Sequence, residues 1–129
     1  MTTILVIEPD PATLLTLSLV LRCFGYEVLE AYNKGEAWGV CAERQEPIHV
    51  IMTNKALHDS PGEFISRFQF LHPQIRVLFV SDASSPTVTE PQDIPCIYAV
   101  LSRPFRADAL VDTIRRLLDR PQTRVISCS

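Results

Sequence analysis

The stretch Thr3-Ile4-Leu5-Val6-Ile7-Glu8-Pro9-Asp10-Pro11 joins an apolar run of strand length to an acidic turn and then to a helix start. The run is nearly continuous rather than alternating, as expected for a parallel strand that is covered on both faces. Asp10 is a natural N-cap, and Pro11 fits the first position of a helix. The stretch therefore predicts a buried strand whose carboxyl end leads directly into a helix.

The same strand-then-helix pattern recurs along the chain. Apolar runs of strand length cover residues 3–7, 27–31, 48–53, 75–81 and 97–102, and segments of helical period cover residues 11–24, 36–45, 61–71 and 106–119. Five strands that alternate with helices predict an α/β sandwich with right-handed crossovers.

The predicted helices carry core stripes and end signals. The core stripe of helix 11–24 is Leu14, Leu17, Leu21 and Phe24, and that of helix 106–119 is Leu110, Ile114, Leu117 and Leu118. Gly25 supplies the stop of the first of these helices, and Pro121 ends the last. Between the fourth and fifth strands, residues 82–95 contain three prolines, and an internal proline costs a helix about 3 kcal/mol. We therefore expect a short or broken fourth helix there.

Composition limits the classes of function. With 129 residues and 14.5 kDa, the chain predicts one domain over residues 1–120, followed by a polar tail over residues 121–129. The 12 Lys and Arg against 15 Asp and Glu give a net charge of −3, and no basic run marks a nucleic-acid surface. The absence of a positively charged leader and of a long apolar run predicts a cytoplasmic protein with no membrane contact.

Four cysteines occur without zinc-ligand or disulfide spacing. We expect Cys23, Cys41 and Cys96 to be buried as small apolar side chains, and Cys128 to be exposed in the tail.

Polar side chains follow four of the five predicted strands at their carboxyl ends. They are Glu8-Pro9-Asp10, then Asn54, Ser81-Asp82 and Ser102-Arg103. Ligands of open parallel sheets bind at this edge. The sequence therefore places the candidate site there.

From Ile4 to about Leu118 the chain resembles the receiver domains of two-component response regulators. The likeness rests on five stretches in order: residues 4–11, 25–28, 54–62, Val80-Ser81 and Arg103-Pro104-Phe105. It implies a flavodoxin-like three-layer sandwich with a five-stranded parallel sheet of order 2-1-3-4-5. In such domains an aspartate takes a phosphoryl group from a histidine kinase, an acidic pair holds Mg²⁺, and the peptide before the matching proline is typically cis.

Compared with that family, the site is altered. Glu8 matches the first acid of the pair, but Pro9 matches the second and Asn54 matches the phosphoacceptor aspartate. Mg²⁺ prefers anionic oxygen ligands, so its binding is expected to be weak or absent, with Glu8 and Asp10 as the remaining weak candidates. Ser81 matches the switch hydroxyl, and Arg103 matches the family's lysine. We predict an Arg103–Glu8 contact in place of the metal-centred network.

The leading interpretation is an atypical pseudo-receiver that is not phosphorylated at Asn54 and acts through contact with a signalling protein or with a second copy of itself. The alternatives are a phosphoacceptor that uses a nearby acid, Asp59 or Asp10, and a flavodoxin-like small-molecule binder. We expect no cofactor and no enzymatic activity, since His58 has no partner nucleophile. Two candidate contact surfaces remain open: the first helix, which carries Leu15 and Leu19 outside its core stripe, and residues 86–104.

Overall fold

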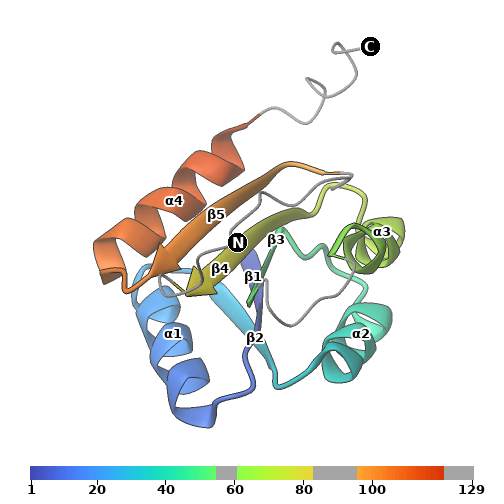
Figure 1. Ribbon diagram of the computed structural model, residues 1–129. Helices are drawn as coiled ribbons and strands as arrows, with labels where there is room; N and C mark the ends of the chain where they lie inside the picture. The colour runs from blue at the N-terminus through green and yellow to red at the C-terminus, as the bar shows by residue number, and fades with distance from the viewer. Residues whose placement is uncertain (55–60, 83–95, 121–129) are drawn as a thin grey trace.

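A five-stranded parallel sheet forms the centre of the molecule in the computed structural model, which describes residues 1–54, 61–82 and 96–120 (Figure 1). The strands are β1 (Thr3–Ile7), β2 (Glu27–Ala31), β3 (Val50–Asn54), β4 (Arg76–Asp82) and β5 (Tyr98–Arg103). They are ordered β2-β1-β3-β4-β5, and every pair is parallel. The predicted flavodoxin-like order 2-1-3-4-5 is confirmed.

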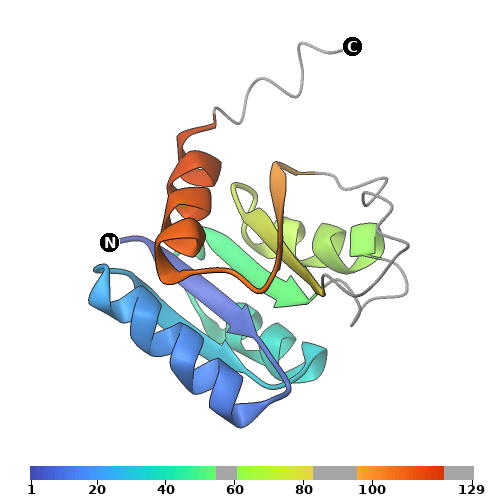
Figure 2. The ribbon, with the colours of Figure 1, turned by 60° about the vertical axis from the view of Figure 1, so that its left-hand side comes forward.

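Helices cover both faces of the sheet. Helices α1 (Pro11–Cys23) and α4 (Ala107–Asp119) lie on one face, while α2 (Lys34–Glu43) and α3 (Pro61–Leu71) lie on the other (Figures 1 and 2). The helix expected within residues 82–95 and the tail expected after residue 120 lie outside the described residues. Within the described ranges, no helix is long and apolar enough to cross a membrane.

The start of α2 differs from the prediction by two residues. Asn33 caps the helix, because its side chain accepts a hydrogen bond from the Glu36 amide at 2.8 Å. The Glu36 carboxylate in turn accepts from the Tyr32 amide at 2.6 Å. These two hydrogen bonds resemble a capping box, except that Glu36 accepts from the amide of the residue before the cap, and they start the helix at Lys34 rather than at residue 36.

The core consists of layers on the two sides of the sheet. Between the sheet and helices α1 and α4, Leu14, Leu17 and Leu21 pack with Leu110, Ile114 and Leu117, as the helical periods predict. On the other face Phe68 is fully buried, and its ring meets those of Phe64 and Trp38 edge-on at centroid distances of 4.5 and 5.5 Å. The described parts of the chain thus form a continuous three-layer sandwich.

Two predictions at the end of α1 are wrong. Phe24 is 47% exposed instead of completing the core stripe, and Cys23 is exposed instead of buried. The helix ends at Cys23 and Phe24 is its C-cap, so the helical period no longer directs the Phe24 ring to the core. Cys41 and Cys96 are buried as predicted, and burial raises the pKa of each thiol to about 12. Cys128 lies outside the described residues.

The turn after α1 requires a glycine. Gly25 has φ +91°, a left-handed conformation that side chains disfavour, although nothing lies within 4 Å of the place of an added Cβ. We expect Gly25→Ala to lower the free energy of unfolding by about 1 kcal/mol through backbone strain alone. Chemical denaturation measures this loss.

The matched control for that variant is Gly39→Ala. Gly39 lies inside α2, and a Cβ there also meets nothing within 4 Å. Since alanine favours a helix over glycine by about 1 kcal/mol, this variant is expected to gain stability. Equal effects of the two substitutions would contradict the role assigned to the positive φ of Gly25.

Candidate functional site

The carboxyl edge of the sheet brings the predicted site residues together. Glu8 directly follows β1, and Asn54 is the last residue of β3. Ser81 of β4 pairs with Ser102 of β5, and Arg103 follows Ser102 at the end of β5. Because all five strands are parallel, these residues share one edge, as the sequence predicts.

An ion pair joins Arg103 to Glu8 across this edge. The Nη2 atom of Arg103 donates to Oε1 of Glu8 at 2.8 Å. The Glu8 side chain is 9% exposed and that of Arg103 is 31% exposed, so the carboxylate is withdrawn from water while the guanidinium is partly open. The other Glu8 oxygen, Oε2, accepts from the backbone amide of Asp10 at 2.9 Å. The predicted contact is confirmed, and both oxygens of Glu8 are engaged within the chain.

Asp10 serves as the N-cap of α1, as its position in the sequence predicts. Its carboxylate accepts from the amide of Thr13 at 3.0 Å and from the Thr13 hydroxyl. These hydrogen bonds from Thr13, the hydroxyl first, lower the pKa of Asp10, and the charge of Arg103 lowers it further. Thr13 was missed as a site residue, although an Asp followed three positions later by Thr is a signal that the sequence contains.

The remaining predicted residues surround this pair. Ser81 is buried, and its hydroxyl lies 3.4 Å from that of Ser102, a partner that the sequence analysis did not identify. Asn54 is half-buried at the end of β3. The peptide between Arg103 and Pro104 is cis, as the family resemblance implies. Asp59 and His58 lie outside the described residues.

The described side chains at this edge do not fit a Mg²⁺ site of the receiver type. Mg²⁺ requires several hard oxygen ligands, usually carboxylates. Glu8 is committed to Arg103 and to an amide, Asp10 is committed to Thr13, and Pro9 has no side-chain donor. Throughout the described ranges, no three His, Cys, Asp or Glu side chains come close enough to hold a metal ion.

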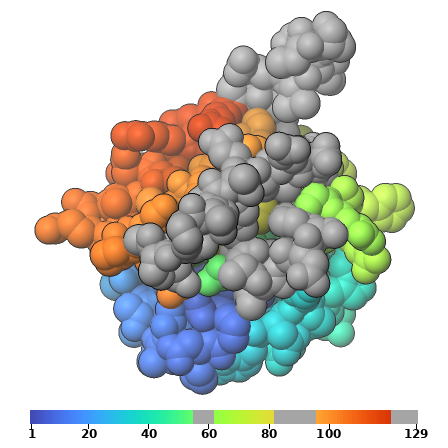
Figure 3. Space-filling model, viewed as in Figure 1, coloured from blue at the N-terminus to red at the C-terminus, as the bar shows by residue number. Residues whose placement is uncertain are grey.

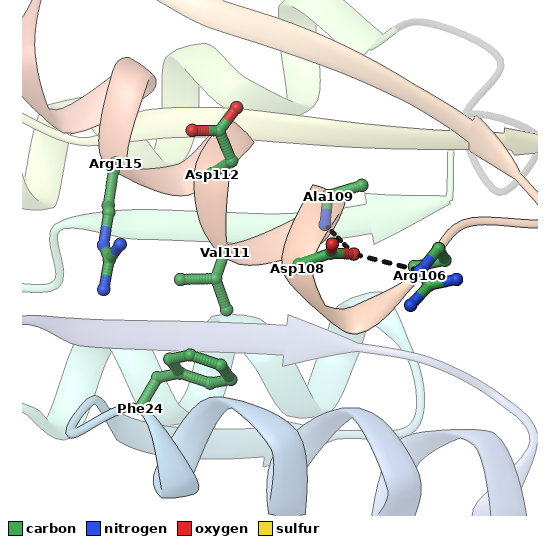
Figure 4. Close-up of a pocket in the computed structure, with 7 residues that line it drawn as sticks. All are labelled: Phe24, Arg106, Asp108, Ala109, Val111, Asp112 and Arg115. Atoms are coloured by element: carbon green, nitrogen blue, oxygen red, sulfur yellow. Dashed lines mark hydrogen bonds and ion pairs between the residues drawn. The ribbon is translucent and has the colours of Figure 1, made fainter.

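A shallow groove lies elsewhere, between the end of α1 and the first half of α4 (Figure 4). Phe24 and Val111 contribute apolar surface to it, and the charged side chains of Arg106, Asp108, Asp112 and Arg115 surround them. Arg106 and Asp108 pair at 3.4 Å at one end. None of the predicted site residues lines this groove, so it gives no support to a small-molecule site at the carboxyl edge.

The two histidines within the described residues, His49 and His72, are hydrogen-bonded to backbone groups of the fold. His49 Nδ1 accepts from the Thr3 amide at 3.0 Å, and burial lowers the pKa of this imidazole. His72 is buried; its Nδ1 accepts from the Ile48 amide at 3.3 Å, and its Nε2 lies 3.2 Å from the Cys41 carbonyl oxygen. Both rings lie near the amino ends of the strands, opposite the candidate site.

The chain is similar in sequence to two proteins of one organism. No protein-family model matches the chain. Over 116 residues the chain is 27% identical to the response regulator receiver protein CpdR of Brucella abortus (strain 2308), covering 89% of this chain and 95% of CpdR. Over 119 residues, 92% of this chain, it is 23% identical to the sensor kinase CckA of the same organism, but it spans only 13% of that protein.

Solved structures show the same fold. A response regulator receiver domain protein from Clostridium thermocellum superposes with a TM-score of 0.73 at 20% identity, covering 93% of this chain and 96% of that one. The receiver domain of the hybrid histidine kinase CckA gives a TM-score of 0.70 at 19% identity, covering 91% of this chain and 99% of that domain.

The fold is therefore that of response-regulator receiver domains, and the relatives support a receiver domain of a two-component system. Of the two relatives described, CpdR is matched over nearly its whole length, whereas CckA is matched in one segment.

Proposed function

We propose that this chain is a pseudo-receiver: a receiver-type signalling module that takes no phosphoryl group at Asn54 and works through contact with another protein. The observation that carries the proposal is the Arg103–Glu8 ion pair at 2.8 Å. This ion pair engages Glu8, which is the one acid of the family's metal-binding pair that this sequence retains.

Three chemical changes support the loss of phosphotransfer. An amide oxygen at Asn54 is a poor nucleophile, and no base that could activate it is evident from the sequence. Pro9 removes a carboxylate, and Arg103 replaces a compact ammonium by a planar guanidinium that pairs with Glu8. With Mg²⁺ binding weak or absent, no metal ion would assist the transfer of a phosphoryl group. We propose no other cofactor and no enzymatic activity of the chain itself.

The test is phosphorylation by a small-molecule donor. After incubation with acetyl phosphate and Mg²⁺, the intact mass of the natural chain is expected to stay unchanged. The matched variant Pro9→Asp/Asn54→Asp/Arg103→Lys restores the three family side chains, and its mass is expected to rise by one phosphoryl group.

A gain of mass by the natural chain would overturn the proposal. Peptide mapping would then locate the acceptor and would show whether Asp10 or Asp59 takes the phosphoryl group. Mg²⁺ titration followed by amide NMR gives a second readout, in which the resonances of Glu8 and Asp10 are expected to stay still in the natural chain.

A further inference from the structure

The outer side of α1 exposes an apolar surface that is continuous along the helix. Leu15 and Leu19 are 56% and 52% exposed, and they lie one turn apart, opposite the buried Leu14, Leu17 and Leu21. The exposed residues Ala12, Thr16 and Cys23 lie on the same side. We define the outer face of α1 as Ala12, Leu15, Thr16, Leu19 and Cys23.

Burying this face would leave no polar side chain without a partner. Its one hydroxyl, that of Thr16, already donates to the Ala12 carbonyl at 3.0 Å. The helix as a whole contains a single charged residue, Arg22, in its last turn. By contrast, the exposed side of α4 carries Asp108, Asp112, Arg115, Arg116 and Asp119. The exposed surface of α1 is therefore much less charged than that of α4, and α1 lies on an outer flank (Figures 2 and 3).

The charges at the two ends of this face are opposite. Asp10 caps the amino end of α1, and the exposed Arg22, whose guanidinium also lies 3.8 Å from the Glu30 carboxylate, lies near its carboxyl end. An identical helix packed antiparallel to α1 would place the partner's Arg22 near Asp10. The two helix dipoles would then run in opposite directions, and apolar side chains would fill the contact between the two charged ends. A face with an apolar centre and opposite charges at its ends is complementary to itself, whereas a strongly charged partner would find little counter-charge there.

We propose that this chain forms a two-fold symmetric dimer in which the outer face of α1 packs antiparallel against the same face of a second copy. Leu15 of one copy then packs against the partner's Leu19, and each Arg22 approaches the partner's Asp10. Such contacts are isologous, so the dimer is closed. The inference deepens the proposed function by naming the protein contact.

The expected dimer is weak. One helix face on each side is smaller than the roughly 800 Å² per partner of a standard interface. In sedimentation equilibrium with a reducing agent present, the average mass of the full chain is expected to rise from 14.5 kDa towards twice that value between about 10 µM and about 1 mM. A mass that stays at the monomer value over this range would overturn the proposal.

Two substitutions test the surface. Leu19→Glu keeps a good helix former at an exposed site and is expected to weaken dimerisation at least about tenfold. Arg22→Glu, which would meet the partner's Asp10 with like charge, is expected to weaken it by up to about fivefold. The matched control is Phe70→Glu, since Phe70 is 85% exposed on α3 and lies outside this face. Equal dimerisation by the natural chain and Leu19→Glu, with both folded by circular dichroism, would contradict the proposed surface.

Oxidative cross-linking tests the orientation. In the antiparallel dimer the two Cys23 side chains lie at opposite ends, roughly 18 Å apart along the axis, so the natural chain is not expected to cross-link through them. Ala12→Cys places a second thiol beside the partner's Cys23 and is expected to give a covalent dimer. A Cys23–Cys23 cross-link in the natural chain would rule out the antiparallel arrangement. The mass measurements need no phosphodonor, so this proposal and that of the pseudo-receiver can fail separately.

Discussion

Replacing Arg103 by Ala is expected to lower the free energy of unfolding by about 2–4 kcal/mol. The Glu8 side chain is only 9% exposed, and the Arg103 guanidinium is paired with it at 2.8 Å. Removing the cation would leave a buried carboxylate with one backbone amide as its remaining described donor. Urea denaturation at neutral pH measures the loss.

A double-mutant cycle separates the ion pair from other effects of Arg103. Glu8→Gln removes the charge but retains an amide oxygen for the Asp10 amide. The double variant Glu8→Gln/Arg103→Ala is expected to be destabilised by less than the sum of the two single variants, because no unpaired charge remains. Strict additivity would show that Arg103 does not stabilise the fold through Glu8. The ion pair on which the proposed function rests would then make no measurable contribution to stability.

Replacing Phe68 by Ala is expected to have a larger effect, about 3–5 kcal/mol. Phe68 is 1% exposed and touches the rings of Phe64 and Trp38, so its loss leaves a cavity between α2, α3 and the sheet. The emission of Trp38 is expected to shift to the red, since its ring loses the neighbour that shields it. Thermal denaturation and fluorescence measure the two effects.

The control for this variant is Phe70→Ala. Phe70 is on the same helix but is 85% exposed, and its removal is expected to change stability by no more than about 0.5 kcal/mol. If both variants lost similar stability, the packing assigned to Phe68 would be wrong.

Much of the fold and part of the site could be predicted because their causes are local. The cap at Asp10 depends on residues within one helical turn, and the sheet edge that collects Glu8, Asn54, Ser81 and Arg103 follows from parallel strand order. The Arg103–Glu8 contact spans 95 residues, but it could be expected once the resemblance to receiver domains placed both residues at that edge.

The misses occur where local periodicity stops. Phe24 continues the core stripe in sequence, yet the helix ends one residue earlier and the ring turns to the surface. Helix α2 starts early because the Asn33 side chain accepts from the Glu36 amide and the Glu36 carboxylate accepts from the Tyr32 amide, and hydropathy reveals neither hydrogen bond. The Ser81–Ser102 contact required the register of β4 against β5, which no single-strand pattern contains.

The two buried thiols allow local opening of the natural chain to be measured without any substitution. With a pKa of about 12, Cys41 and Cys96 are almost entirely protonated at neutral pH, and alkylating reagents react with the thiolate. Each can therefore be labelled only when its surroundings open, whereas the exposed Cys23 is labelled directly. Cys41 lies in α2 and Cys96 lies just before β5, so their two labelling rates report how often the α2 layer and the β5 edge separate from the rest of the molecule.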